Sequence, residues 1–171
     1  HVRSRRQRQD VYKRQIDDYR RLSDSIASGV AVVTVGGGSK FTGVTVDSFL
    51  DVSWDPPTML VSILSLSRVM DVMECAQMFT LSVLNADQED IATWLGASGQ
   101  PNYGLLNDIP TVDGECGPAH IAQACAFFEV EVTDRHTVAT HTLFSGPVVA
   151  QGGNPDTQPL VRRNRIYGTF G

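Results

Sequence analysis

A serine-rich turn followed by an arginine is the stretch of this sequence best suited to chemistry. Ser65, Ser67 and Arg68 follow the apolar run 58–64, and a helical pattern begins at Arg68. Hydroxyl groups, a guanidinium and the unpaired N–H groups at a helix start are donors that bind phosphate. We therefore expect a phosphate site here, with Ser67 capping the helix. From the local sequence alone, an ordinary strand-to-helix turn with a solvated Arg68 is the simpler interpretation.

A second polar segment precedes this turn, where a predicted strand ends. It contains Thr45, Val46, Asp47 and Ser48. Small polar side chains of this kind can hydrogen-bond the edge of a flat heterocycle, although Asp and Ser are also common in plain corners. A phosphate at one end and a ring at the other suggest a mononucleotide.

Several blocks of the sequence, taken in order, resemble the flavin reductase-like family with the FMN-binding split-barrel fold. The blocks are GVTVDSFLDVSWDPPTMLVSI with the serine-rich turn after it, MFTLSVL, HTLFSGPVV and PLVRRNRIYG, and they span roughly residues 18–168. The resemblance implies an all-β chain with short helices, folded as an antiparallel Greek-key split β-barrel. The sequence departs from the family pattern at Asp47, Val69, Ser82 and the pair Arg162-Arg163. Asp47 stands where a small residue is usual, and the two arginines replace aromatic or His residues.

The resemblance also implies roles for individual residues. Residues 45–48 would contact the flavin ring, and Ser65, Ser67 and Arg68 would hold its phosphate. Ser82 would contact the flavin as well, although a small hydroxyl on a strand is usually satisfied by backbone. His141 would lie on the nicotinamide side as the catalytic residue. A hydrogen-bonded structural histidine is the alternative for His141.

The activity that the resemblance implies is that of an NAD(P)H-dependent FMN reductase. Such an enzyme passes hydride from NADH or NADPH to flavin, with FMN expected and FAD as the alternative. The resemblance further implies a homodimer that can supply reduced flavin to a partner monooxygenase. Two alternatives remain open: an oxidoreductase that keeps FMN as a prosthetic group and acts on another substrate, and a non-catalytic flavin-binding or storage protein. The sequence has no evident nucleophile, paired-carboxylate or metal constellation, and flavin chemistry requires none.

Composition limits the class of protein. A chain of 171 residues is most simply one domain. From residue 23 onward it has six Lys and Arg against sixteen Asp and Glu, which argues against a nucleic-acid partner. No apolar stretch approaches the ~20 residues of a membrane span, so a cytoplasmic protein is expected. Three scattered cysteines fit neither a zinc site nor a disulfide framework, and buried reduced thiols are expected.

The basic N-terminal segment differs from the rest of the chain. Eight of the fourteen Lys and Arg lie within residues 1–22. This segment lacks apolar periodicity, so residues 1–17 are interpreted as a disordered or non-native tail and residues 18–171 as the domain.

Alternating apolar and polar residues, bounded by Gly, Pro and polar corners, predict many short strands. The predicted strands are 31–35, 41–46, 50–54, 58–64, 78–84, 124–133, 140–150 and 160–170, and the predicted helices are 18–29, 68–76 and 87–95. Residues 97–119 are rich in Gly, Pro, Asn and Asp and predict an irregular surface excursion. Trp54 and Trp94 are expected in the core. Short strands with hairpin-like connections favour a closed antiparallel barrel.

Overall fold

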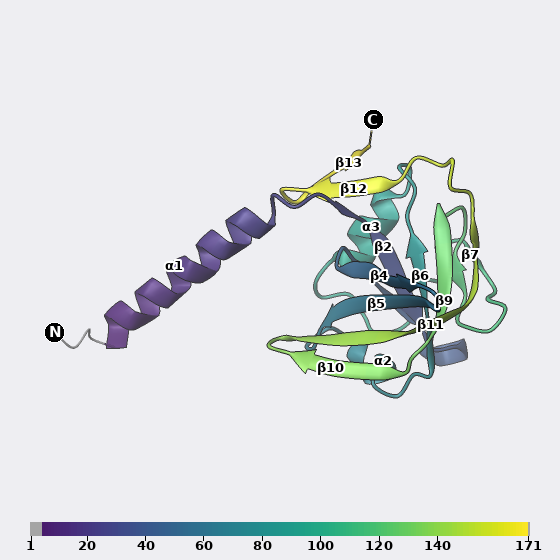
Figure 1. Cartoon of the computed structure of the whole chain (residues 1–171), viewed down its shortest axis with the longest axis horizontal. Helices are drawn as coiled ribbons and strands as arrows, with labels where there is room; N and C mark the ends of the chain where they lie inside the picture. Colours follow the sequence, from purple (N-terminus) through teal and green to yellow (C-terminus); the bar gives the residue numbers. More distant parts are fainter. Residues whose placement is uncertain (1–4, 171) are drawn as a thin grey trace.

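A computed structural model describes residues 5–170 and shows a β-rich body from which one helix projects (Figure 1). The helices are α1 (Arg5–Ser23), α2 (Met70–Met73) and α3 (Glu89–Gly96), with a 3-10 turn η1 (Gly38–Lys40). The strands are β1 (Ser28–Gly29), β2 (Ala31–Val35), β3 (Thr42–Val46), β4 (Phe49–Trp54), β5 (Pro57–Leu64), β6 (Met78–Val83), β7 (Thr111–Val112), β8 (His120–Ile121), β9 (Ala126–Glu131), β10 (Asp134–Val138), β11 (His141–Gly153), β12 (Leu160–Arg163) and β13 (Ile166–Thr169).

The main sheet is antiparallel and curls into a split barrel. Its strand order is β3-β2-β6-β9-β11-β5-β4, with β10 paired to the first part of β11. The long strand β11 pairs with β5 through its first half and with β9 through its second half. The expected all-β antiparallel barrel is therefore confirmed.

Residues 160–170, predicted as one strand, form two strands, and neither of them joins the main sheet. β12 and β13 form a hairpin, and β12 pairs with the short strand β1 in a separate three-stranded sheet. An ion pair between Arg165 and Asp24 and a hydrogen bond from Asn164 N to Asp24 O hold the hairpin turn against the end of α1. The hairpin thus lies over the start of the barrel.

Two apolar clusters explain why β2 is buried along its whole length. The first fills the barrel and is formed by alternate residues of several strands, including Val33, Val61, Leu81 and Phe144. The second lies between the outer face of the sheet and α3, and it includes Val32 and Leu95. Because successive strand residues point to opposite faces, a strand between two apolar layers is apolar throughout.

A buried carboxylate fixes the loop 113–119 against the sheet. Glu129 on β9 is fully buried and accepts hydrogen bonds from the backbone N–H groups of Glu115 (2.8 Å), Cys116 (2.6 Å) and Gly117 (2.7 Å). Burial alone would raise the pKa of Glu129, but these three bonds and the nearby His120 outweigh it, so the pKa lies below its ordinary value. Glu129 therefore remains ionised inside the protein.

Several sequence predictions are wrong in detail. Trp54 is 87% exposed and Trp94 is 47% exposed, so neither belongs to the core. Strand β10 was not predicted because its sequence, DRHTV, is polar and all five residues are exposed. All three cysteines are free, but only Cys125 is buried; Cys75 and Cys116 are exposed.

The N-terminal helix also differs from the predictions. The helix expected over 18–29 begins instead at Arg5, so residues 5–17 of the expected tail form its first part, and residues 1–4 lie outside the described part. The helix ends at Ser23 rather than Gly29, and none of its side chains is buried. α1 therefore contributes nothing to the core.

Candidate active site

The end of β3 brings three of the predicted flavin contacts to one small cavity of about 240 Å³. Thr45 lies at this cavity and donates its hydroxyl to the carbonyl of Ala92 in α3 (2.7 Å). Val46 belongs mainly to the core, and the Asp47 side chain pairs with Arg162 of β12. The exposed Ser48 follows immediately after Asp47, so residues 45–48 form one wall of a shallow site.

The serine turn lies beside the start of β11. Ser65 N donates to the carbonyl of Thr140 (2.9 Å), and the Ser65 hydroxyl lies 3.0 Å from the Thr142 hydroxyl. Ser67 is partly exposed, and its hydroxyl makes no hydrogen bond within residues 5–170. The two predicted phosphate hydroxyls are thus near the surface, one paired and one free to bind a ligand.

The prediction that Ser67 caps a helix from residue 68 to 76 is wrong. Helix α2 covers only Met70–Met73, its N-cap is Val69, and no side chain caps it. A single turn of helix contributes only a small dipole, so a phosphate at this turn would depend on side chains rather than on a helix terminus.

Arg68 acts first as a structural link. Its Nη2 atom donates to the carbonyl of Gly43 in β3 (3.0 Å) and to the carbonyl of Leu95 in α3 (2.7 Å). Its Nε atom is buried without a partner, while Nη1 makes no hydrogen bond within the described residues. Burial lowers the pKa of the guanidinium, which nevertheless remains charged near neutral pH. Nη1 is therefore the one part of Arg68 that is available to a ligand.

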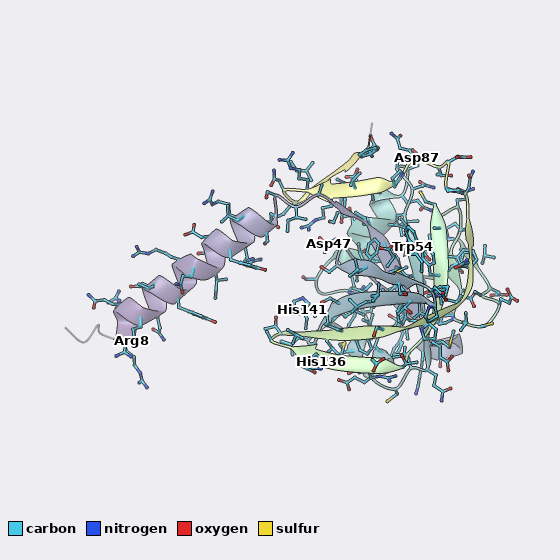
Figure 2. The ribbon with its side chains drawn as sticks, in the orientation of Figure 1. Arg8, Asp47, Trp54, Asp87, His136 and His141 are labelled. Carbon is cyan, nitrogen blue, oxygen red and sulfur yellow. The ribbon has the colours of Figure 1, made fainter. Side chains whose placement is uncertain are left out.

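His141 lies at the same end of the sheet as the serine turn. It is the first residue of β11 and pairs in register with Leu64, the last residue of β5. Ser62, two residues before Leu64, donates its N–H to the carbonyl of Ser48 (2.9 Å), so His141 and the end of β3 belong to one neighbourhood. Figure 2 shows Asp47 and His141 on the same side of the body. The His141 Nδ1 atom lies 3.0 Å from the Thr140 hydroxyl.

Ser82 does not join this group. It is fully buried on β6, and its hydroxyl accepts a hydrogen bond from the N–H of Ile121 (3.1 Å). In this arrangement the Ser82 side chain is not accessible to a flavin, and its hydroxyl holds β8 against β6 instead. Local sequence could not reveal this partner, because Ile121 in β8 is 39 positions from Ser82 and lies just after the irregular segment 97–119.

Arg162 was noted in the sequence only as a departure from the family pattern, and Tyr167 was not a predicted site residue. Both line the cavity at the end of β3. Burial raises the pKa of Tyr167, as do Asp47 and Glu89, while Arg162 opposes the shift; the phenol is therefore neutral at pH 7. The pairing of Arg162 with Asp47 could not be predicted from the sequence, because the two residues are 115 positions apart.

A larger cavity, about 950 Å³, contains none of the predicted site residues. It lies between the β2–β3 turn, the end of α2 and the loop 113–119. The cavity near Asp47 is smaller than the ~300–1,000 Å³ usual for small-molecule sites. One chain therefore offers a flavin a wall with suitable donors rather than an enclosed pocket.

The donor chemistry nevertheless fits a flavin phosphate. The free Ser67 hydroxyl, the Ser65 hydroxyl and the unused Nη1 of Arg68 are all donors suited to an anion. Among residues 5–170, no group of three or more His, Cys, Asp or Glu could hold a metal ion. None of the described helices is long and apolar enough to cross a membrane.

Comparison with known proteins adds a family match. The family described as "Flavin reductase like domain" matches residues 23–171. An NADH-dependent FMN reductase, AsuE2 from Streptomyces nodosus subsp. asukaensis, is 33% identical over 155 residues, which cover 90% of this chain and 84% of that protein.

Solved structures agree with this match. The NADH:FAD oxidoreductase SgcE6 of Streptomyces globisporus C-1027 superposes with a TM-score of 0.87 at 28% identity, covering 92% of this chain and 94% of the other. BorF, the flavin reductase component of a bacterial two-component tryptophan halogenase, gives a TM-score of 0.82 at 28% identity, covering 91% and 98%.

Proposed function

The chain belongs to the flavin reductase-like domain family, and from this premise we propose that it is an NADH-dependent flavin reductase that uses FMN as its flavin. AsuE2 is named as an NADH-dependent FMN reductase and SgcE6 as an NADH:FAD oxidoreductase, which supports an oxidoreductase acting on free flavin. When bound, the isoalloxazine ring itself accepts hydride, so the protein's task is to bind and orient the two reactants.

One observation of the structure carries the proposal. Three segments far apart in sequence meet at one end of the barrel: the end of β3, the serine turn after β5 and the start of β11. The bonds that join them are Ser62 N to Ser48 O (2.9 Å), Ser65 N to Thr140 O (2.9 Å) and the contact between the Ser65 and Thr142 hydroxyls (3.0 Å). This convergence supports the proposal, because the candidates for binding the ring, the phosphate and the nicotinamide lie in three segments that contact one another.

The roles follow from the position of each group. Ser65, Ser67 and the Nη1 atom of Arg68 would bind the flavin phosphate, while residues 45–48 would lie along the ring. His141 would orient the nicotinamide, since it lies at the mouth of the same region and is partly exposed. Ser82 has no part in this proposal because it is buried.

The test is an assay of NADH and NADPH oxidation with and without added FMN, FAD and riboflavin. We expect NADH oxidation to depend on added flavin and to be fastest with FMN. A yellow protein whose turnover ignores free flavin would instead indicate a bound prosthetic group and another substrate. A flavin-binding protein without turnover would indicate storage, and a protein that binds no flavin would contradict the proposal outright.

We further propose that the active form is a homodimer joined through the face around β4. This strand lies at the end of the main sheet and exposes Leu50 (56%), Val52 (50%) and Trp54 (87%). A hollow of about 280 Å³ beside Trp54 includes Phe128 and Val148. Large apolar side chains grouped on an edge strand favour burial against another chain. A second subunit would also help to enclose the shallow flavin wall.

Sedimentation of the wild type and of Leu50→Asp tests the dimer. We expect the wild type to sediment as a dimer and the variant as a monomer with weaker FMN binding. Ile166→Asp is the matched control, since Ile166 is similarly exposed (70%) but lies on β13. A wild-type monomer that binds FMN fully would refute the arrangement.

Supply of reduced flavin to a monooxygenase is proposed on the example of BorF, a reductase component of a two-component halogenase. The shallow site supports it, because a flavin bound on an open wall can leave after reduction. A cytoplasmic location remains a prediction from the sequence.

A further inference from the structure

An ion pair links the candidate flavin wall to the C-terminal hairpin. Arg162 of β12 donates through Nη1 to the Oδ2 atom of Asp47, which follows β3. The two residues are 115 positions apart in sequence. Both are departures from the family pattern, and the structure shows that these two departures contact each other.

The pair stands at the wall of the cavity at the end of β3. Its side chains are each about one third exposed, 31% for Arg162 and 36% for Asp47. Thr45 and Tyr167 line the same cavity, and Tyr167 carries no charge at neutral pH. Asp47 and Arg162 are therefore the only charged residues among those that line this cavity within residues 5–170.

The charge of Asp47 matters because the reaction changes the charge of the ligand. A flavin that gains two electrons and one proton becomes an anion at its ring, while the oxidised ring is neutral. An unpaired carboxylate beside the ring would repel the reduced form and leave the oxidised form nearly unaffected. A carboxylate paired with a guanidinium has no net charge and repels neither.

We propose that Arg162 is a specificity-determining residue, which neutralises Asp47 so that the site binds the anionic reduced flavin as well as the oxidised flavin. This inference rests on the proposed function, since it requires flavin to bind beside Asp47. Arg162 acts through Asp47 and is a positioning residue rather than a catalytic one. The ratio of the two flavin affinities is then the property that the ion pair controls.

The experiment measures dissociation constants for oxidised FMN and, under anaerobic conditions, for chemically reduced FMN. Arg162→Gln should weaken binding of reduced FMN roughly tenfold more than binding of oxidised FMN. The double variant Asp47→Asn with Arg162→Gln should restore the wild-type ratio within about twofold, because it removes both charges. Arg162→Lys, which keeps the charge, should also keep the ratio.

Arg163→Gln is the matched control. Arg163 is the next residue on the same strand, is exposed and makes no ion pair within the described residues. Its loss removes the same charge from the hairpin without freeing Asp47, so the affinity ratio should not change. A change equal to that of Arg162→Gln would refute the specific role of the pair.

Failure of this inference and failure of the proposed function give different results. If wild type reduces FMN with NADH but Arg162→Gln weakens both flavin forms equally, or the double variant fails to restore the ratio, this inference is wrong and the proposed function stands. If wild type binds neither form, both are wrong. Thermal melting of the flavin-free variants completes the test: a lower melting temperature with an unchanged ratio would show that the pair only fastens the hairpin.

Discussion

Replacing Arg68 with alanine tests both of the roles that its guanidinium can have. Its Nη2 atom links the serine turn to β3 and α3 through the carbonyls of Gly43 and Leu95. Hydrogen bonds from a charged donor contribute about 1.5–3 kcal/mol each, but one nitrogen makes both bonds and the side chain is partly exposed. We expect a loss of about 2–3 kcal/mol in the free energy of unfolding.

For a domain of this size, 1 kcal/mol shifts the melting temperature by about 2–4 °C. Arg68→Ala should therefore melt roughly 5–10 °C below the wild type, which circular dichroism can follow. Arg163→Ala should melt within about 1 °C of the wild type, since Arg163 is exposed. Arg68→Lys should fall between, because an ammonium lacks the planar fork of a guanidinium. An Arg68→Ala melting temperature equal to that of the wild type would refute the structural link.

Flavin titration separates the second role of Arg68 from the first. If the free Nη1 atom binds phosphate, Arg68→Ala should weaken FMN roughly tenfold or more and riboflavin much less, which brings the two affinities together. High salt should reduce the FMN preference of the wild type in the same direction. Equal loss of both flavins would show that Arg68 serves the fold alone and that the phosphate binds elsewhere.

Three further predictions concern other parts of the chain. Glu129→Gln should lower the free energy of unfolding at pH 7 by about 3 kcal/mol, because an amide cannot accept from the three N–H groups that the buried carboxylate binds. Because the pKa of Glu129 is lower in the folded state, its contribution to the free energy of unfolding is complete above about pH 4.3 and is lost as the pH falls through the folded-state pKa. Urea titrations in which the variant and the wild type differ in stability by a constant amount down to pH 2 would contradict this. His141→Ala should lower turnover or raise the KM for NADH while the FMN dissociation constant stays nearly unchanged. Steady-state kinetics with a parallel FMN titration measure both. An equal loss of FMN affinity and melting temperature would show that His141 has a structural role. Deleting residues 1–15 should leave melting and activity intact because no α1 side chain is buried, and loss of the thermal transition would show otherwise.

Strand positions were largely predictable because their causes are local. The apolar run 58–64 predicted strand β5, and the structure buries its alternate residues Met59, Val61 and Ile63. Trp54 was expected in the core but is exposed, since alternation shows which residues share a face but not what covers that face. Within residues 5–170 nothing covers the face of β4 that carries Leu50, Val52 and Trp54.

The candidate site was less predictable because its contacts are long-range. The serine turn and the end of β3 were recognised as sequence blocks, and the structure brings them together with His141. The carbonyl partners of Arg68 and the burial of Ser82 depend on α3 and on the loop before β8, which no local pattern relates to them. Side-chain type could be predicted to suit a phosphate, but not which donor atoms remain free.

Contacts in the candidate site join residues that are far apart in sequence, and this separation affects when the site forms during synthesis. Ser65 and Thr142 are 77 positions apart, and Asp47 and Arg162 are 115 positions apart. Contacts of such high sequence separation form late, because a long loop must close before they contribute free energy. A ribosome-bound chain that lacks β11 and β12 thus has the serine turn but not the contacts of the candidate site, so flavin binding would report that these two strands have been made and have folded into place.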